Sequence, residues 1–186
     1  MSNVVYSLAV SLDGYVEGPE GEIDWSAPDD ELHAFYNDRA REIGTFLHGR
    51  RIYELMASYW PGVEESQTGP AHEIEFAHIW THTPKVVFSR TLEKVEWNST
   101  LMRSVVAEEI AALKSRSDKD MDVGGANLAA AFMRLGLIDE YRLFVFPIVL
   151  GSGTPYFPPV DGQPSLRLIE SRAFGSGVVY LRYRNA

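Results

Sequence analysis

Short apolar runs alternate with segments of helical spacing over the first two thirds of the chain. The first run, residues 4–10, is rich in valine and ends at the turn signal Asp13-Gly14, which predicts a buried strand. Residues 15–17 are expected to extend it briefly. After residue 140 the apolar runs follow one another with no helical segment between them. The pattern predicts strands at 4–10, 43–48, 85–89, 121–123, 141–150, 166–171 and 177–183, and helices at 26–41, 52–56, 71–80, 105–115 and 128–135.

Two boundaries are predicted from local signals. Ser26 is expected to cap the first helix, because Asp29 follows three residues later at the spacing of a capping box. The segment Pro61–Pro70 is rich in Gly, Glu, Ser and Pro and is expected to form a surface loop.

The order of these elements indicates an α/β fold. Strand–helix alternation is typical of parallel strands, and consecutive strands are typical of antiparallel ones. We therefore expect a mixed central sheet that is parallel early and antiparallel at its C-terminal edge. A chain of 186 residues buries one sizeable core, so residues 1–186 are expected to form a single domain.

Composition narrows the classes of partner. Hydrophobic residues make up 45% of the chain and charged residues 23%, as in ordinary globular proteins. No membrane-length apolar run and no basic, apolar leader is seen, which favours a cytoplasmic location. The absence of cysteine excludes disulfides, thiolate metal sites and a cysteine nucleophile. A net charge of −9 disfavours nucleic acid and anionic membranes as partners, so an anionic ligand needs a local basic site.

One predicted strand runs directly into two glycines and then into a helix. Glycine tolerates positive φ and lets a ligand approach the backbone, and a helix N-terminus attracts phosphate. A tight turn without a ligand explains the spacing equally well, and the Gly-x-Gly-x-x-Gly fingerprint is absent. The candidate phosphate-binding residues here are Gly124, Gly125, Ala126, Asn127 and Leu128.

Two further strand ends carry basic residues. At the end of the predicted strand 43–48, a pair of arginines suits a phosphate group. At the end of the predicted strand 85–89, hydroxyl, guanidinium and hydroxyl groups in sequence suit a 2′-phosphate such as that of NADP. In isolation, a solvated pair and a polar turn are the more frequent explanations. Their shared placement supports the ligand hypothesis, because ligands bind along the carboxyl ends of parallel strands. The residues are Gly49, Arg50 and Arg51, and Ser89, Arg90 and Thr91.

Two other patterns favour structural roles. His78 and His82 are four residues apart, but no His-Glu-x-x-His pattern is present, so no metal site is predicted. Ser152 lies between two glycines, but Leu150 and Thr154 occupy the glycine positions of a hydrolase elbow.

Four segments carry a family resemblance that spans essentially the whole chain. They are residues 11–16 (SLDGYV), 49–54 (GRRIYE, similar to Gly-Arg-x-Thr-x-Glu), 123–157 (VGGANLAAAFMRLGLIDEYRLFVFPIVLGSGTPYF) and 174–181 (FGSGVVYL). With these segments the chain resembles the reductase domain of bacterial riboflavin-biosynthesis deaminase-reductases, within the dihydrofolate reductase-like superfamily.

The resemblance implies a three-layer α/β/α fold that binds NADPH at residues 49–51, 89–91 and 124–128. It also suggests a homodimer built through the C-terminal strands. Two departures matter: Ile52 replaces the usual threonine, and no deaminase domain or zinc-binding His/Cys set is present.

On the substrate side, dihydrofolate reductases carry a carboxylate shortly after a tryptophan at a helix start. Trp25 and Asp29 are the similar substrate-binding candidates, and Asp30 and Asp13 are the candidate proton donors. Helix capping is the better explanation for at least one of the two adjacent aspartates, Asp29 and Asp30.

These features together predict an NADPH-dependent reductase of a pyrimidine- or pterin-like heterocycle. The alternatives are the riboflavin-pathway reductase step itself and a non-catalytic binding protein that kept the fold.

Overall fold

The computed structural model describes residues 2–159 and 165–186. Its strands are β1 (Val4–Ser11), β2 (Tyr15–Glu17), β3 (Ile43–Gly49), β4 (Lys85–Phe88), β5 (Ser99–Met102), β6 (Asp120–Gly124), β7 (Glu140–Phe146), β8 (Thr154–Pro155), β9 (Leu166–Ala173) and β10 (Val179–Asn185). Its helices are α1 (Asp30–Arg41), α2 (Arg50–Ser66), α3 (Ala71–His82), α4 (Ala107–Arg116) and α5 (Ala126–Arg134), with a 3-10 turn at Asp24–Ser26.

The main sheet has eight strands in the order β5-β4-β3-β6-β1-β7-β10-β9. The six strands from β5 to β7 are parallel, whereas β10 runs antiparallel to both β7 and β9. The expected mixed sheet with an antiparallel C-terminal edge is therefore confirmed. A separate ladder joins the short strands β2 and β8.

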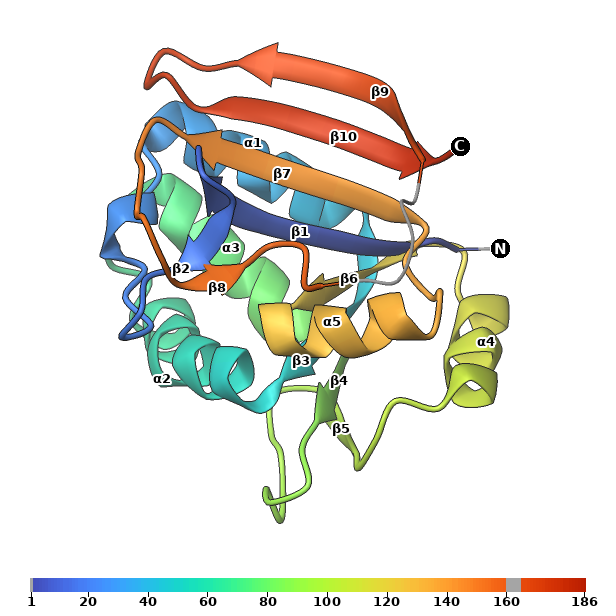
Figure 1. The fold of residues 1–186 in the computed structure, drawn as a ribbon. Coiled ribbons are helices and arrows are strands. Elements are labelled where there is room, and N and C mark those ends of the chain that lie inside the picture. The colour runs from blue at the N-terminus through green and yellow to red at the C-terminus, as the bar shows by residue number, and fades with distance from the viewer. Residues whose placement is uncertain (1, 160–164) are drawn as a thin grey trace.

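Helices cover both faces of the sheet, with α4 and α5 in front and α1 and α3 behind in Figure 1. Successive side chains of a strand point to opposite faces, so neighbouring residues enter different cores. Leu47 and Val86 pack in a cluster with Phe132 of α5. Phe46 and Val87, one position away, pack on the face covered by α1, α2 and α3. This alternation produces the three-layer α/β/α arrangement.

Helix α1 begins later than the capping-box pattern predicted. Its N-cap is Asp29, whose carboxylate accepts a hydrogen bond from the Leu32 backbone N–H at 2.9 Å. Ser26 instead ends the 3-10 turn, where its hydroxyl donates to the Ile23 carbonyl. The prediction of a Ser26 cap was wrong because Ala27 precedes a proline, which favours the extended conformation that Ala27 adopts.

Helix α2 is far longer than expected and continues through Pro61. The expected loop over residues 61–70 was therefore wrong for residues 61–66. Trp60 and Val63 continue the helical spacing of Met56 beyond the predicted end at residue 56, and all three are buried or half-buried. Burial of this stripe outweighs the one backbone hydrogen bond that Pro61 cannot donate.

The C-terminal boundary of β7 also differs. The strand ends at Phe146 rather than at residue 150, because Pro147 has no N–H for the ladder. Strand β5 was not predicted, since Ser99–Met102 is short and only partly apolar.

The three strand ends singled out above lie side by side. Gly49 of β3 pairs with Phe88 of β4, and His48 of β3 pairs with Gly124 of β6. Because β4, β3 and β6 are adjacent and parallel, their carboxyl ends share one edge of the sheet. Among the described residues, no helix is both long and apolar enough to span a membrane.

Candidate functional site

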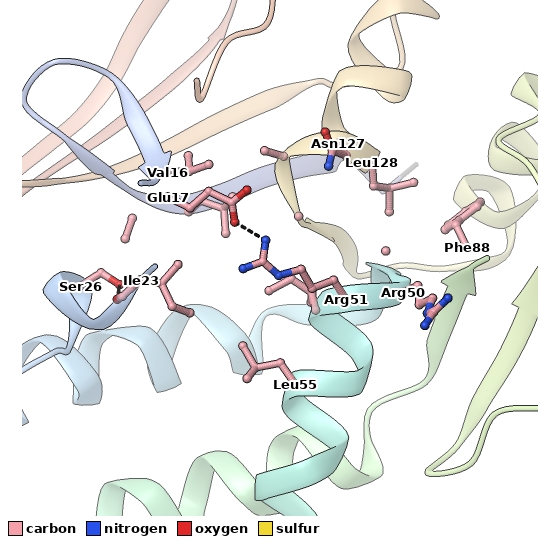
Figure 2. A pocket seen from close by; sticks show the side chains of 16 residues that line it. Val16, Glu17, Ile23, Ser26, Arg50, Arg51, Leu55, Phe88, Asn127 and Leu128 are labelled. Carbon is pink, nitrogen blue, oxygen red and sulfur yellow. Dashed lines mark hydrogen bonds and ion pairs between the residues drawn. The ribbon is translucent and has the colours of Figure 1, made fainter. Parts of the chain in front are cut away.

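A cavity of about 430 Å³, here called the strand-end cavity, opens at this edge. Strands β1 and β2 and the first turns of α2 and α5 form its walls, as Figure 2 shows. Seven of the predicted cofactor residues line it: Gly49, Arg50, Arg51, Gly125, Ala126, Asn127 and Leu128.

Two helices begin at the strand-end cavity, and both have glycine as N-cap. Neither Gly49 of α2 nor Gly125 of α5 provides a side-chain cap, so the first N–H groups lack the usual internal acceptor. Gly125 has φ +105°, which an L side chain rarely adopts. The glycine is therefore required by the turn itself, and the two helix N-termini form a positive rim around the cavity.

The two arginines at the start of α2 point in different directions (Figure 2). Arg50 Nη1 donates to the Thr91 hydroxyl at 2.8 Å and Arg50 Nε donates to Glu54. Arg50 thus joins the β3 strand end to the β4 strand end, two segments predicted independently. About half of its side chain is exposed to solvent.

Arg51 forms an ion pair with Glu17 of β2, with 2.7 Å between Nη1 and Oε2. Glu17 also accepts a hydrogen bond from the Thr154 hydroxyl at 2.8 Å. The Glu17 carboxylate therefore lies opposite the arginine pair. The sequence reasoning missed Glu17, and only the pairing of β2 with β8 brings it to the cavity.

The Ser89–Thr91 segment lies at the edge of the site rather than in its wall. The Ser89 hydroxyl accepts hydrogen bonds from the N–H groups of Thr91 and Leu92, which holds the turn after β4. Arg90 is exposed. Thr91 reaches the cavity only through its contact with Arg50.

The substrate-side candidates lie outside the strand-end cavity. Trp25 and Asp29 border a separate hollow with Phe146, and the Trp25 ring meets Phe146 edge to face. The carboxylate of Asp29 is used for capping. The Asp30 side chain is 96% exposed, and its carboxylate lies 3.9 Å from His72. Asp30 is therefore poorly placed to deliver a proton in the strand-end cavity.

Asp13 holds a turn. Its carboxylate accepts hydrogen bonds from the Ser11 hydroxyl and from the N–H groups of Leu150 and Gly151. These contacts, that of Ser11 above all, hold the pKa of Asp13 at about 2. Because the group is ionised at neutral pH, it has no proton to give. The segment Gly151–Gly153 that it anchors is a structural turn rather than a hydrolase elbow.

A second cavity of about 310 Å³, here called the helix-side cavity, lies between the sheet and helices α1, α2 and α3. It adjoins the strand-end cavity, because Leu8, Ala9, Ser26 and Ile52 line both. Its polar groups include Asp122 of β6 and His48 of β3, which the sequence reasoning did not select. The alternation of Met121, Asp122 and Val123 is the signal that was missed, because a charged residue at the centre of a buried strand needs an explanation.

Burial changes the protonation of both groups. It raises the pKa of Asp122 to about 7, with the nearby Arg142 guanidinium opposing the rise. It lowers the pKa of His48 to about 3, helped by the positive charge of Lys85. The imidazole is therefore neutral at physiological pH, while Asp122 keeps its proton to a much higher pH than an ordinary aspartate.

Two histidines on α3 lie on the outer surface. His78 Nδ1 is 3.0 Å from Glu64 Oε1 of α2, and His82 Nδ1 is 2.9 Å from the His78 carbonyl. The three side chains are close enough to share an ion. The contacts they already make join α2 to α3, away from both cavities.

Comparison with known proteins identifies the family of the chain. The family model of the RibD C-terminal domain matches residues 2–180. The protein YyaP of Bacillus subtilis (strain 168) is 36% identical over 181 residues, which cover 97% of this chain and 93% of YyaP.

Solved structures show the same fold. The crystal structure of a putative riboflavin biosynthesis protein from Shewanella sp. PV-4 has a TM-score of 0.77 at 23% identity, covering 100% of this chain and 99% of the other. Dihydrofolate reductase from Enterococcus faecalis, complexed with NADP(H) and RAB-propyl, has a TM-score of 0.63 at 16% identity, covering 98% and 96%. The expected dihydrofolate reductase-like fold is confirmed, and the family supports a reductase-type protein. From the match of its sequence over almost its whole length, the chain belongs to the RibD C-terminal domain family.

Proposed function

We propose that this protein is an NADPH-dependent reductase of a planar nitrogen heterocycle of pyrimidine or pterin type. The observation that carries the proposal is the meeting of two glycine-capped helix N-termini and an arginine pair at one cavity. Such N-termini bind phosphate groups through free N–H donors and the helix dipole. In a chain of net charge −9, this local positive rim is the feature that attracts an anionic cofactor.

The residues present fit the cofactor. Gly125 has no Cβ, and the nearest atom to an added one would be Ile52 Cγ1 at 3.6 Å, so the floor of the turn is open to a pyrophosphate. Arg50, with Thr91 beside it, is placed to bind a further phosphate. The nicotinamide ring supplies the hydride when it is bound.

Apolar groups of β1 and β2 complete the strand-end cavity. Leu8, Ala9 and Val16 form a wall without charged atoms, next to the opening into the helix-side cavity. A wall of this kind orients a flat ring and excludes water from its face. We therefore assign the reacting end of the cofactor to this wall and the substrate to the adjoining helix-side cavity.

The riboflavin-pathway step is a narrower alternative, because its substrate carries its own phosphate. Three basic residues that are scattered over the chain are already engaged by other groups. Lys85 donates to the Thr83 carbonyl, Arg103 donates to the Ser89 carbonyl, and Arg172 pairs with Glu31. None of these three residues lines either cavity, which favours a substrate without a phosphate group.

Cofactor binding is the first measurement. Titration with NADPH, followed by fluorescence, is expected to show saturation well below millimolar concentration. Arg50→Ala is expected to weaken binding about tenfold to a hundredfold, because it removes a charged donor to a phosphate. Arg134→Ala is the matched control, since Arg134 is exposed in the last turn of α5, outside both cavities. Absence of saturation in the unchanged protein would contradict the proposed function and favour a fold kept without this cofactor.

We also propose a homodimer formed through β9. This strand is the edge of the main sheet, and Leu168 and Ile169 on it are exposed. Sedimentation is expected to give a dimer for the unchanged chain and a monomer for the double substitution Leu168→Glu and Ile169→Glu. A dimer that survives the double substitution would place the contact elsewhere.

A further inference from the structure

The helix-side cavity has a floor that suits a flat, unsaturated ring. Aromatic side chains from α1, β3, α3 and β7 surround it, and they stack or meet edge to face with planar groups. The cavity adjoins the strand-end cavity at the residues that line both, among them the small residue Ala9. The aromatic lining residues are Tyr36, Phe46, Phe76, Trp80 and Phe144.

Asp122 is the polar exception in this lining. It lies on β6 in the middle of the sheet, flanked by Val5 of β1 and Phe46 of β3. Its Oδ1 is buried, and within residues 2–159 and 165–186 no donor reaches it. An unpartnered buried acceptor destabilises a fold, so its presence needs another explanation.

The charged groups around Asp122 do not neutralise it by contact. Arg142 of β7 donates to Glu140 at 2.7 Å, and Arg39 of α1 pairs with Glu42 at 3.2 Å. His48 of β3 is neutral, for the reason given above. Among the described residues, further ionisable groups near Asp122 are phenols that stay protonated: Tyr36 in the cavity and, on the opposite face of the sheet, Tyr6 and Tyr156.

We propose that Asp122 is the catalytic acid of this protein, and that it recognises and protonates a ring nitrogen of a heterocycle bound in the helix-side cavity. This inference rests on the proposed reductase function. The ring must carry a C=N bond whose nitrogen faces β6 and whose carbon faces the strand-end cavity.

The step balances in atoms and electrons. The C=N carbon accepts the hydride, with its two electrons, from the reduced nicotinamide, which is thereby oxidised. The C=N double bond becomes a single bond, and the nitrogen takes the proton from the Asp122 carboxyl group. The Asp122 carboxylate then regains a proton from water.

Within the part of the chain that the structure describes, no other acid near the two cavities has this combination of position and protonation. Glu17 is engaged by Arg51 and Thr154, and Asp13 is an ionised turn anchor. Asp30 is almost fully exposed to solvent. Asp122 combines a buried oxygen that no donor reaches with a place in the lining of the helix-side cavity.

Binding of 2,4-diaminopyrimidine tests the assignment. This base is planar, small and changes its ultraviolet spectrum when a ring nitrogen gains a proton. We expect the unchanged protein to bind it, with and without NADPH, and to give the spectrum of the protonated ring at pH values where the free base is neutral. Asp122→Asn is expected to weaken binding at least tenfold and to abolish the protonated spectrum, while Asp118→Asn, at an exposed position between α4 and β6, leaves both unchanged.

Two outcomes would overturn the proposal: no binding of the base to the unchanged protein, or the same protonated spectrum from Asp122→Asn. NADPH titration of the same samples keeps this result separate from the proposed function. Normal NADPH affinity in Asp122→Asn shows that the variant is folded, so that a lost base signal is due to Asp122. Failure of NADPH binding in every sample contradicts the reductase proposal, while the base spectrum still reports on Asp122 in the cofactor-free protein.

Discussion

Replacement of Glu140 by alanine is expected to lower the free energy of unfolding by about 3–5 kcal/mol. Glu140 is completely buried, and its carboxylate accepts hydrogen bonds from Arg142 at 2.7 Å, Arg182 at 2.8 Å and Arg184 at 2.9 Å. Arg142 is itself 2% exposed. The substitution leaves this buried guanidinium without its anion, which is the reason for the large effect. Urea unfolding followed by circular dichroism measures it.

Glu170→Ala is the matched control, because Glu170 approaches the same Arg182 at 3.8 Å from the partly exposed β9. It is expected to cost less than about 1 kcal/mol, as surface ion pairs do. Equal losses of unfolding free energy in the two variants would show that burial of Glu140 and its arginine partners adds nothing to stability.

The pH dependence of stability gives a second readout of Glu140. Burial alone would raise its pKa, but hydrogen bonds from Arg182, Arg142 and Arg184 prevail and lower the pKa to about 2. A carboxylate with a lowered pKa in the folded state contributes stability above its unfolded pKa. That contribution is lost as the pH falls from about 4.5 towards 2. Glu140→Gln is expected to flatten the stability profile in this range.

Replacement of Gly153 by alanine is expected to have the second-largest effect, a loss of about 3 kcal/mol together with weaker NADPH binding. A Cβ at Gly153 would lie 2.0 Å from the carbonyl oxygen of Glu17, and the glycine has φ +144°. The obstacle is backbone, so β2 and β8 must separate. Movement of β2 shifts Glu17 and its ion pair with Arg51 out of the strand-end cavity wall.

Gly151→Ala separates the effect of the backbone clash from the effect of the positive φ. Gly151 has φ +80° in the same turn, but an added Cβ meets no atom within 4 Å. The free energy of unfolding of Gly151→Ala is expected to fall by only about 1 kcal/mol, because of the strain of positive φ, and the variant is expected to bind NADPH normally. Thermal unfolding and NADPH titration of both variants test this. A Gly153 variant as stable as the Gly151 variant would show that β2 and β8 are not packed as described.

Much of the fold could be predicted from local patterns. The valine-rich run of β1 and the Gly124-Gly125 turn between a strand and a helix depend on residues close in the chain, and both are found where expected. The switch from alternating elements to consecutive strands correctly indicated the antiparallel edge. The errors arose where a distant partner decided the outcome, as at Pro61, where packing of α2 carried the helix through a residue that usually ends one.

The candidate site also contains residues that local patterns predict and residues that depend on distant contacts. The strand-end residues of β3 and β6 could be selected because glycine and arginine at the start of a helix have a local chemical meaning. Glu17 could not be selected in this way. Asp122 carried only the signal of a charged residue between two apolar ones, and its role depends on neighbours that are distant in the chain. Glu17 reaches the cavity through the pairing of β2 with β8, and Asp122 through the packing of three helices over β6.

The sequence by itself determined the order of the elements, the layered α/β class and the glycine and arginine content of the strand ends, on which the proposal of phosphate binding rests. These follow from side-chain periodicity and from the conformational freedom of glycine, which act over a few residues. Only the tertiary structure decided which carboxyl group lines the helix-side cavity. The reason is physical: the protonation and the accessibility of an acid depend on the groups that surround it in space, and those come from segments far apart in the chain.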